Sequence, residues 1–198
     1  MSDAKIAIVY HSGYGHTASQ ARAVARGAAI PGVETVLVPV EGADAPWEAL
    51  AECDALIFGC PTYMGGQSAQ FKAFQDATSS TVFAAGSLWR DKIAAGFTNS
   101  ASRSGDKLAT LQQLAIFAAQ HGMHWVGLGL PPGNNSSSGS EEDLNRLGFF
   151  LGAAAQSNAD EPADTAPPAA DLRTAEHLGR RVAEVTLQFV RGREPAFA

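Results

Sequence analysis

Cysteine is scarce in this sequence. Only Cys53 and Cys60 occur among 198 residues, which is too few for the disulfide framework of a small secreted domain. Cys60 ends an apparent strand that Cys53 precedes, so the two should lie roughly 20 Å apart at ~3.3 Å per residue. Because a disulfide requires Cα atoms within about 7 Å, we expect two reduced thiols. Residues 1–5 also lack the layout of a signal peptide, and a cytoplasmic location is therefore expected.

Excess positive charge and long apolar runs are lacking as well. Fourteen basic residues stand against twenty acidic ones, for a net charge of −6 without any basic stripe, so nucleic acid is not an expected partner. No apolar run reaches the ~18 residues that a membrane span needs. His11, His124 and His177 have no carboxylate or cysteine at metal-ligand spacing, so no metal site is expected.

What the sequence does contain is an alternation of strand and helix patterns. Apolar, often β-branched runs predict five strands, over 6–10, 33–40, 55–59, 92–98 and 124–129. Helical spacing of apolar residues occurs between them. This alternation predicts one α/β domain over residues 1–198, with a doubly wound parallel sheet and helices on both faces.

Composition changes after the fifth predicted strand. Residues 131–170 are rich in Gly, Ser, Asn, Ala and Pro, and we expect this segment to be mostly irregular and exposed, with a helix over 147–155. A last helix is predicted from Asp171, as its N-cap, to Gly192. Apolar residues share one of its faces, as the helical period requires, and it should close the open side of the sheet.

Ligands of open parallel sheets bind beyond the carboxyl ends of the strands, where three loops here are rich in glycine and hydroxyl groups. The first, 11–17, joins a strand to a helix N-terminus, where unsatisfied N–H groups and the helix dipole favour a phosphate. Ser12 and Thr17 offer hydroxyls, while Gly13 and Gly15 allow a close backbone approach. The alternative is an ordinary turn with a Ser or Thr cap.

The other two loops have equally open alternatives. Residues 61–66 combine a proline and two glycines with Tyr63 and Met64, which offer apolar surface for a flat ring or fold into the core. Residues 98–105 are a run of short polar side chains. They suit the polar edge of a heterocycle, or form a solvated loop.

Together the three loops resemble the WrbA family of flavodoxin-like NAD(P)H:quinone oxidoreductases. The family's phosphate-loop, strand-end and helix-end motifs correspond to Ser-Gly-Tyr-Gly-His at 12–16, Phe-Gly-Cys-Pro-Thr at 58–62 and His-Gly-Met at 121–123. The resemblance covers 5–129 and implies a five-stranded flavodoxin-like sheet of strand order 2-1-3-4-5. Departures include Tyr63 and Met64, where the family usually has arginine and phenylalanine.

By this resemblance the protein binds FMN and takes electrons from NAD(P)H. The implied FMN-binding residues are Ser12, Gly13, Tyr14, Gly15, His16, Thr17, Pro61, Thr62, Tyr63, Met64, Gly65, Thr98, Asn99, Ser100, Ala101, Ser102, Gly105 and His121. Tyr14 would also touch the nicotinamide, and Phe83 stands near a tryptophan of the family that helps to roof the site. His121 is the expected catalytic residue, stabilising charge on the reduced flavin.

Two functions therefore follow from the sequence. The first is a two-electron flavoenzyme that passes hydride through flavin N5 to a quinone, for which no acid–base dyad is required. The second is a flavodoxin-type electron carrier, or a non-enzymatic FMN-binding protein. A single domain leaves the flavin in a shallow groove, and the apolar stretch 78–88 predicts an interface. We expect a homo-oligomer, a tetramer with a dimer as the alternative.

Overall fold

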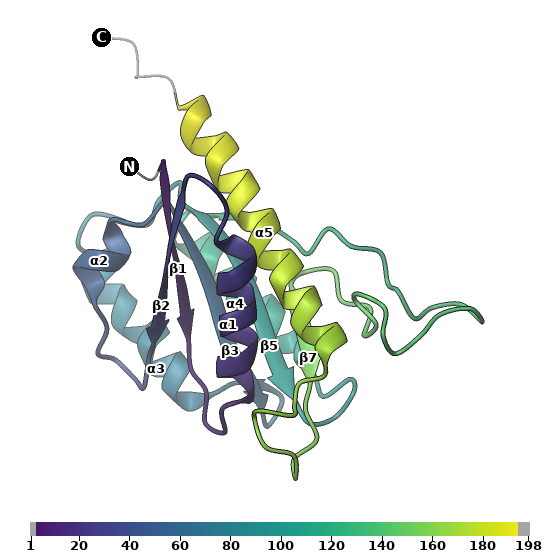
Figure 1. Ribbon diagram of the computed structural model, residues 1–198. Coiled ribbons are helices and arrows are strands. Elements are labelled where there is room, and N and C mark those ends of the chain that lie inside the picture. The colour runs from purple at the N-terminus through teal and green to yellow at the C-terminus, as the bar shows by residue number, and fades with distance from the viewer. Residues whose placement is uncertain (1–2, 194–198) are drawn as a thin grey trace.

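The computed structural model describes residues 3–193 and has a central parallel sheet (Figure 1). The sheet order is β2-β1-β3-β5-β6, which confirms the flavodoxin-like order 2-1-3-4-5. Its strands are β1 (Ala4–Tyr10), β2 (Val33–Pro39), β3 (Ala55–Tyr63), β5 (Ile93–Ser100) and β6 (His124–Trp125). Two short strands lie off this path: β4 (Gly66–Gln67) is antiparallel to β3, and β7 (Ala153–Gln156) is parallel to β5.

Helices cover both faces of the sheet, as predicted. On one face lie α1 (His16–Ala28) and α5 (Ala169–Gly192), side by side in front of the sheet in Figure 1. On the other lie α2 (Trp47–Ala51), α3 (Ala69–Thr78), the π-helical turn η1 (Ser79–Phe83) and α4 (Lys107–Gln120). Alternation along β1 divides the core: Ile6 and Ile8 pack under α1 and α5, whereas Ala7 and Val9 face the other layer.

Two glycines bring α1 and α5 into backbone contact. A Cβ added at Gly27 of α1 would lie 1.8 Å from the Glu176 carbonyl oxygen, and one added at Gly179 of α5 would lie 2.0 Å from that of Val24. No side chain can occupy either position without separating the helices. The close approach sets α5 directly beside α1, above the sheet.

The fifth strand differs from its prediction because it is split. β6 ends at Trp125, residues 126–152 leave the sheet, and β7 returns the chain to pair with the carboxyl half of β5. The predicted strand 124–129 is therefore too long, and the predicted helix over 147–155 is wrong. The three alanines of β7 favour a helix locally, but they are buried against β5, and sheet pairing outweighs that preference.

The start of the last helix also differs. α5 begins at Ala169 after Pro168, so Asp171 lies inside the first turn instead of serving as N-cap. Its carboxylate is buried and accepts hydrogen bonds from Arg146. A tertiary ion pair thus replaces the local cap that the sequence suggested.

Cys53 and Cys60 are both buried and free, as expected. No helix among residues 3–193 has the length and apolar character needed to cross a bilayer. Nor does this part of the chain bring together three or more His, Cys, Asp or Glu side chains that could hold a metal ion.

Candidate functional site

A cavity of about 580 Å³ opens at the carboxyl ends of β1, β3 and β5, within the size range of small-molecule sites. We call it the strand-end cavity. Its lining comes from all three predicted loops and one further segment: Ser12, Tyr14, His16, Thr17, Pro61, Thr62, Tyr63, Met64, Asn99, Ser100, Ala101, Ser157 and Ala159. Eleven of these thirteen residues were predicted from the sequence. None of the thirteen is a lysine or an arginine.

The first loop presents a set of free backbone donors. Gly15 precedes α1 at φ 88° and offers no side-chain cap, while Ser12 Oγ accepts the Ala18 N–H at 3.0 Å. Within residues 3–193, the N–H groups of residues 14–17 have no acceptor. Four adjacent donors at a helix N-terminus form an anion site, and the hydroxyl proton of Ser12 remains available to a ligand.

The sequence did not predict that residues 157–165 cover this loop. His16 Nε2 donates to the Glu161 carbonyl at 2.8 Å, Ser19 Oγ donates to that of Ala163 at 2.8 Å, and Asn99 Nδ2 donates to Ser157 Oγ at 2.8 Å. No local signal in the sequence could show these contacts, because they depend on the return of the chain through β7.

The second loop is a tight hairpin. Thr62 pairs with Gln67 and Tyr63 with Gly66, which leaves Met64 at φ 47° and Gly65 at φ 87° as a two-residue turn. Positive φ at both positions is the rule for a type I′ turn, but it strains a methionine. Met64 is fully exposed, so it offers the apolar surface that the sequence predicted.

Tyrosine rings close one side of the strand-end cavity. Tyr14 and Tyr63 meet edge to face at 6.2 Å between ring centroids. Burial is the main cause that raises the pKa of Tyr63, so its hydroxyl stays protonated at neutral pH. A Cβ at Gly13 would lie 2.7 Å from this hydroxyl, so a larger residue there would push the end of the Tyr63 side chain aside.

Thr98 lies beneath the strand-end cavity and does not line it. Its side chain is buried and donates to the Cys60 carbonyl at 2.7 Å, while Thr62 Oγ1 lies 2.9 Å from Thr98 Oγ1 and 2.8 Å from Thr110 Oγ1. The hydroxyls tie β3, β5 and α4 together at the cavity floor. Other predicted residues off the lining are Gly13, Gly15, Gly65, Ser102 and Gly105.

His121 and Phe83 do not line the strand-end cavity. They lie in a second hollow of about 760 Å³, the outer cavity, which is bounded by α3, η1, α4 and the hairpin. The two cavities share Tyr63 and Met64. The structure therefore brings His121 and Phe83 together with Tyr63 and Met64, and the hairpin lies between them and the residues that line only the strand-end cavity.

The protonation of His121 follows from its neighbours. Thr78 Oγ1 donates its one proton to the Gln75 carbonyl at 2.6 Å and lies 2.9 Å from His121 Nε2, so Nε2 is the donor. Burial lowers the pKa of His121, and the ring is neutral at pH 7. Within residues 3–193, Nδ1 has no partner. Nδ1 of His121 is thus a buried acceptor without a hydrogen-bond partner among these residues, next to the outer cavity.

Comparison with known proteins agrees with this geometry. The sequence profile of the NADPH-dependent FMN reductases matches residues 12–131. A curated relative named flavodoxin FldP, from Pseudomonas aeruginosa, is 45% identical over 93% of this chain and 97% of its own length. An NAD(P)H dehydrogenase (quinone) from Archaeoglobus fulgidus is 33% identical over 92% and 97%.

Solved structures give the same result. The chain superimposes on a flavodoxin, WrbA-like protein from Agrobacterium tumefaciens with a TM-score of 0.73 and 42% identity, over 93% of this chain and 98% of the other. The resemblance to WrbA is therefore confirmed. The profile match, the relatives and the donor-lined cavity at the strand ends agree, and the chain belongs to the NADPH-dependent FMN reductase family with a WrbA-like flavodoxin fold.

Proposed function

We propose that this protein is an FMN-dependent NAD(P)H:quinone oxidoreductase. The observation that carries the proposal is the strand-end cavity: it adjoins the N-terminus of α1, where the N–H groups of residues 14–17 have no acceptor within residues 3–193, and its lining contains no lysine or arginine. Such a cradle suits one monophosphate, held by dipoles and hydrogen bonds. Several curated relatives, including those from Archaeoglobus fulgidus and Aromatoleum aromaticum, carry the name NAD(P)H dehydrogenase (quinone).

The residues present fit each part of FMN. Residues 14–17 and Ser12 would bind the phosphate, Tyr63 and Met64 would lie against the ring, and residues 99–101 would meet its polar edge. FMN supplies hydride transfer through its N5 when it is bound. The protein's own residues then need only to bind and orient the flavin and nicotinamide rings and to shield them from water. The neutral His121 and the hydroxyl cluster around Thr98 agree with this.

Anaerobic reduction tests the proposed function directly. We expect NADH or NADPH to bleach the yellow FMN-loaded protein, and a quinone to restore the colour, with ping-pong kinetics because the two substrates use the flavin in turn. Stopped-flow absorbance at the flavin band is the measurement. Dithionite, which reduces any accessible flavin, is the control.

A second candidate is an electron carrier, favoured by the 45% identity to flavodoxin FldP. A carrier would not be reduced by either nicotinamide, yet would accumulate a one-electron-reduced form during dithionite titration. That pattern in the same experiment would contradict the quinone reductase and support the carrier.

We further infer that the active unit is a homo-oligomer, a tetramer or a dimer, in which subunits share sites. His121 and Phe83 lie outside the strand-end cavity of their own chain, so a neighbouring subunit's flavin is the one they would reach. Phe83 is half exposed and packs edge to face with His121 at 6.2 Å. Phe83 therefore offers an exposed apolar surface that a neighbour can cover, with the buried His121 beside it.

Phe83→Ala tests this shared site. We expect the variant to raise the KM for the nicotinamide by about tenfold, since one aromatic contact is worth roughly 1.5 kcal/mol, with unchanged FMN affinity. Leu37→Ala, which truncates an exposed apolar side chain outside both cavities and outside the stretch 78–88, is the control. A fully active monomer in light scattering at assay concentration would contradict the inference.

A further inference from the structure

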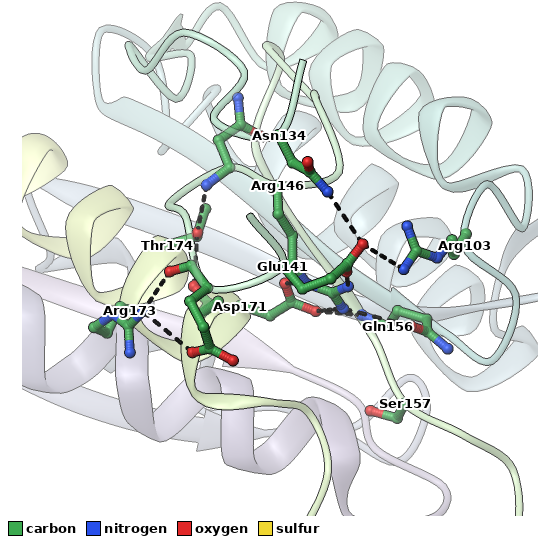
Figure 2. A network of polar contacts seen from close by, with 12 residues as sticks. Arg103, Asn134, Glu141, Arg146, Gln156, Ser157, Asp171, Arg173 and Thr174 are labelled. Atoms are coloured by element: carbon green, nitrogen blue, oxygen red, sulfur yellow. Dashed lines mark hydrogen bonds and ion pairs between the residues drawn. The ribbon is translucent and has the colours of Figure 1, made fainter. Parts of the chain in front are cut away.

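A buried ion pair anchors the segment 126–152 to α5. Arg146 and Asp171 meet through two parallel bonds, Nε to Oδ1 at 2.7 Å and Nη2 to Oδ2 at 2.9 Å, and their side chains are only 5% and 2% exposed. This bidentate geometry is specific to arginine. Figure 2 shows the pair at the centre of a polar network that joins four parts of the chain.

The network reaches the third loop of the strand-end cavity at two points. Glu141 bonds to Arg146 with one carboxylate oxygen, and its other oxygen lies 2.6 Å from Nη2 of Arg103. Gln156 donates its backbone N–H to Asp171 at 2.9 Å and its side-chain Nε2 to the Ala101 carbonyl at 3.0 Å. Both connections run from the buried pair to residues 101–103, and the one through Glu141 to Arg103 can be followed in Figure 2.

The same loop is held from behind by a buried lysine. Nζ of Lys107 lies 2.5 Å from the Ser102 carbonyl and 2.9 Å from that of Arg103, and burial lowers its pKa to about 8. Residues 101–106 form no helix or strand of their own. Their backbone is therefore held by the side chains of Gln156 in β7 and Lys107 in α4, and Glu141 of 126–152 holds the side chain of Arg103.

We propose that the segment inserted into the fifth strand positions the third loop for FMN, with Arg146 as the positioning residue. The inference rests on the proposed FMN binding. Residues 99–101 line the strand-end cavity, and a loop ordered before binding does not lose conformational freedom when the ligand arrives. Loosening the buried pair therefore weakens flavin binding from a distance, although Arg146 does not line the cavity.

Arg146→Lys tests the proposal, because it keeps the charge and removes the bidentate geometry. We expect FMN affinity, measured by flavin fluorescence quenching, to fall about tenfold, as the loss of one charge-assisted bond implies. The reduction potential of bound FMN should shift to more negative values, because a looser loop stabilises negative charge on the reduced ring less well. Amide exchange over 101–106 should speed up in the flavin-free protein.

Arg173→Lys is the matched control. Arg173 also ties the same segment to α5, by donating to the Glu142 carbonyl at 2.6 Å, but it has no contact with the third loop among the described residues. We expect less than a twofold change in affinity there. Glu141→Gln, at a half-exposed position, leaves the buried pair intact and should give an intermediate loss.

The outcomes separate this inference from the proposed function. Failure of the wild-type protein to bind FMN would overturn the proposed function. Normal FMN binding by the wild type, with equal losses in the two arginine variants or unchanged exchange over 101–106, would overturn only the positioning role. A negative potential shift confined to Arg146→Lys and Glu141→Gln supports it, since a merely structural defect would not change the potential of the remaining bound flavin.

Discussion

FMN is expected to bind two to four orders of magnitude more tightly than riboflavin. The two ligands differ only in the phosphate, for which residues 14–17 hold free N–H groups and Ser12 a free hydroxyl proton. Charge-assisted hydrogen bonds contribute about 1.5–3 kcal/mol each, and two of them account for roughly 10²–10⁴ in affinity. Fluorescence-quenching titrations of the flavin-free protein with each ligand measure the ratio.

Ser12→Ala sharpens this test. The variant removes one hydroxyl donor to the phosphate, so we expect FMN affinity to fall about tenfold. Riboflavin serves as the internal control, because it has no phosphate and its affinity should stay the same. Equal affinities for FMN and riboflavin in the wild-type protein would rule out the first loop as a phosphate site.

Gly179→Ala is expected to destabilise the protein by about 3 kcal/mol, the upper part of the range for overpacked cores. In an ordinary helix interior the same change stabilises by up to about 1 kcal/mol. The sign reverses here because the new Cβ would lie 2.0 Å from the Val24 carbonyl oxygen, and a backbone atom cannot rotate away. Urea denaturation, followed by circular dichroism, gives the change in the free energy of unfolding.

Gly192→Ala is the control for this prediction. Gly192 ends the same helix, and a Cβ there would have no described atom within 4 Å, so we expect a change below about 0.5 kcal/mol. Gly27→Ala, on the opposite helix, should match the loss at Gly179. Wild-type stability in the Gly179 variant would mean that α1 and α5 are not in backbone contact.

Local patterns were sufficient for the sheet and for most of the strand-end cavity. The two helical layers follow from the alternation of strand and helix patterns, because the strands of a parallel sheet must be buried on both faces. The strand order came from the resemblance to the WrbA family. Ser12, Thr17, Tyr63 and Asn99 line the cavity as predicted, because the carboxyl ends of neighbouring parallel strands meet at one edge.

Predictions were wrong where distant residues compete with local preference. Residues 153–156 favour a helix by composition but form a strand, since pairing with β5 buries three alanines. Asp171 has the residue type of an N-cap but bonds to Arg146, which is 25 positions earlier in the chain. The FMN contact of His121 stays a prediction: its side chain lies at the outer cavity, with Nε2 2.9 Å from Thr78 Oγ1.

The sequence by itself determined the class of fold and the three loops that meet at the strand ends, because these depend on short-range periodicity and on residue types suited to turns, while the strand order was implied by the motifs shared with the WrbA family. Only the tertiary structure decided the split of the fifth strand, the covering of the first loop by residues 157–165 and the buried pair of Arg146 and Asp171. Each of these joins residues far apart in the chain, and their contact energies exist only once the sheet has brought them together.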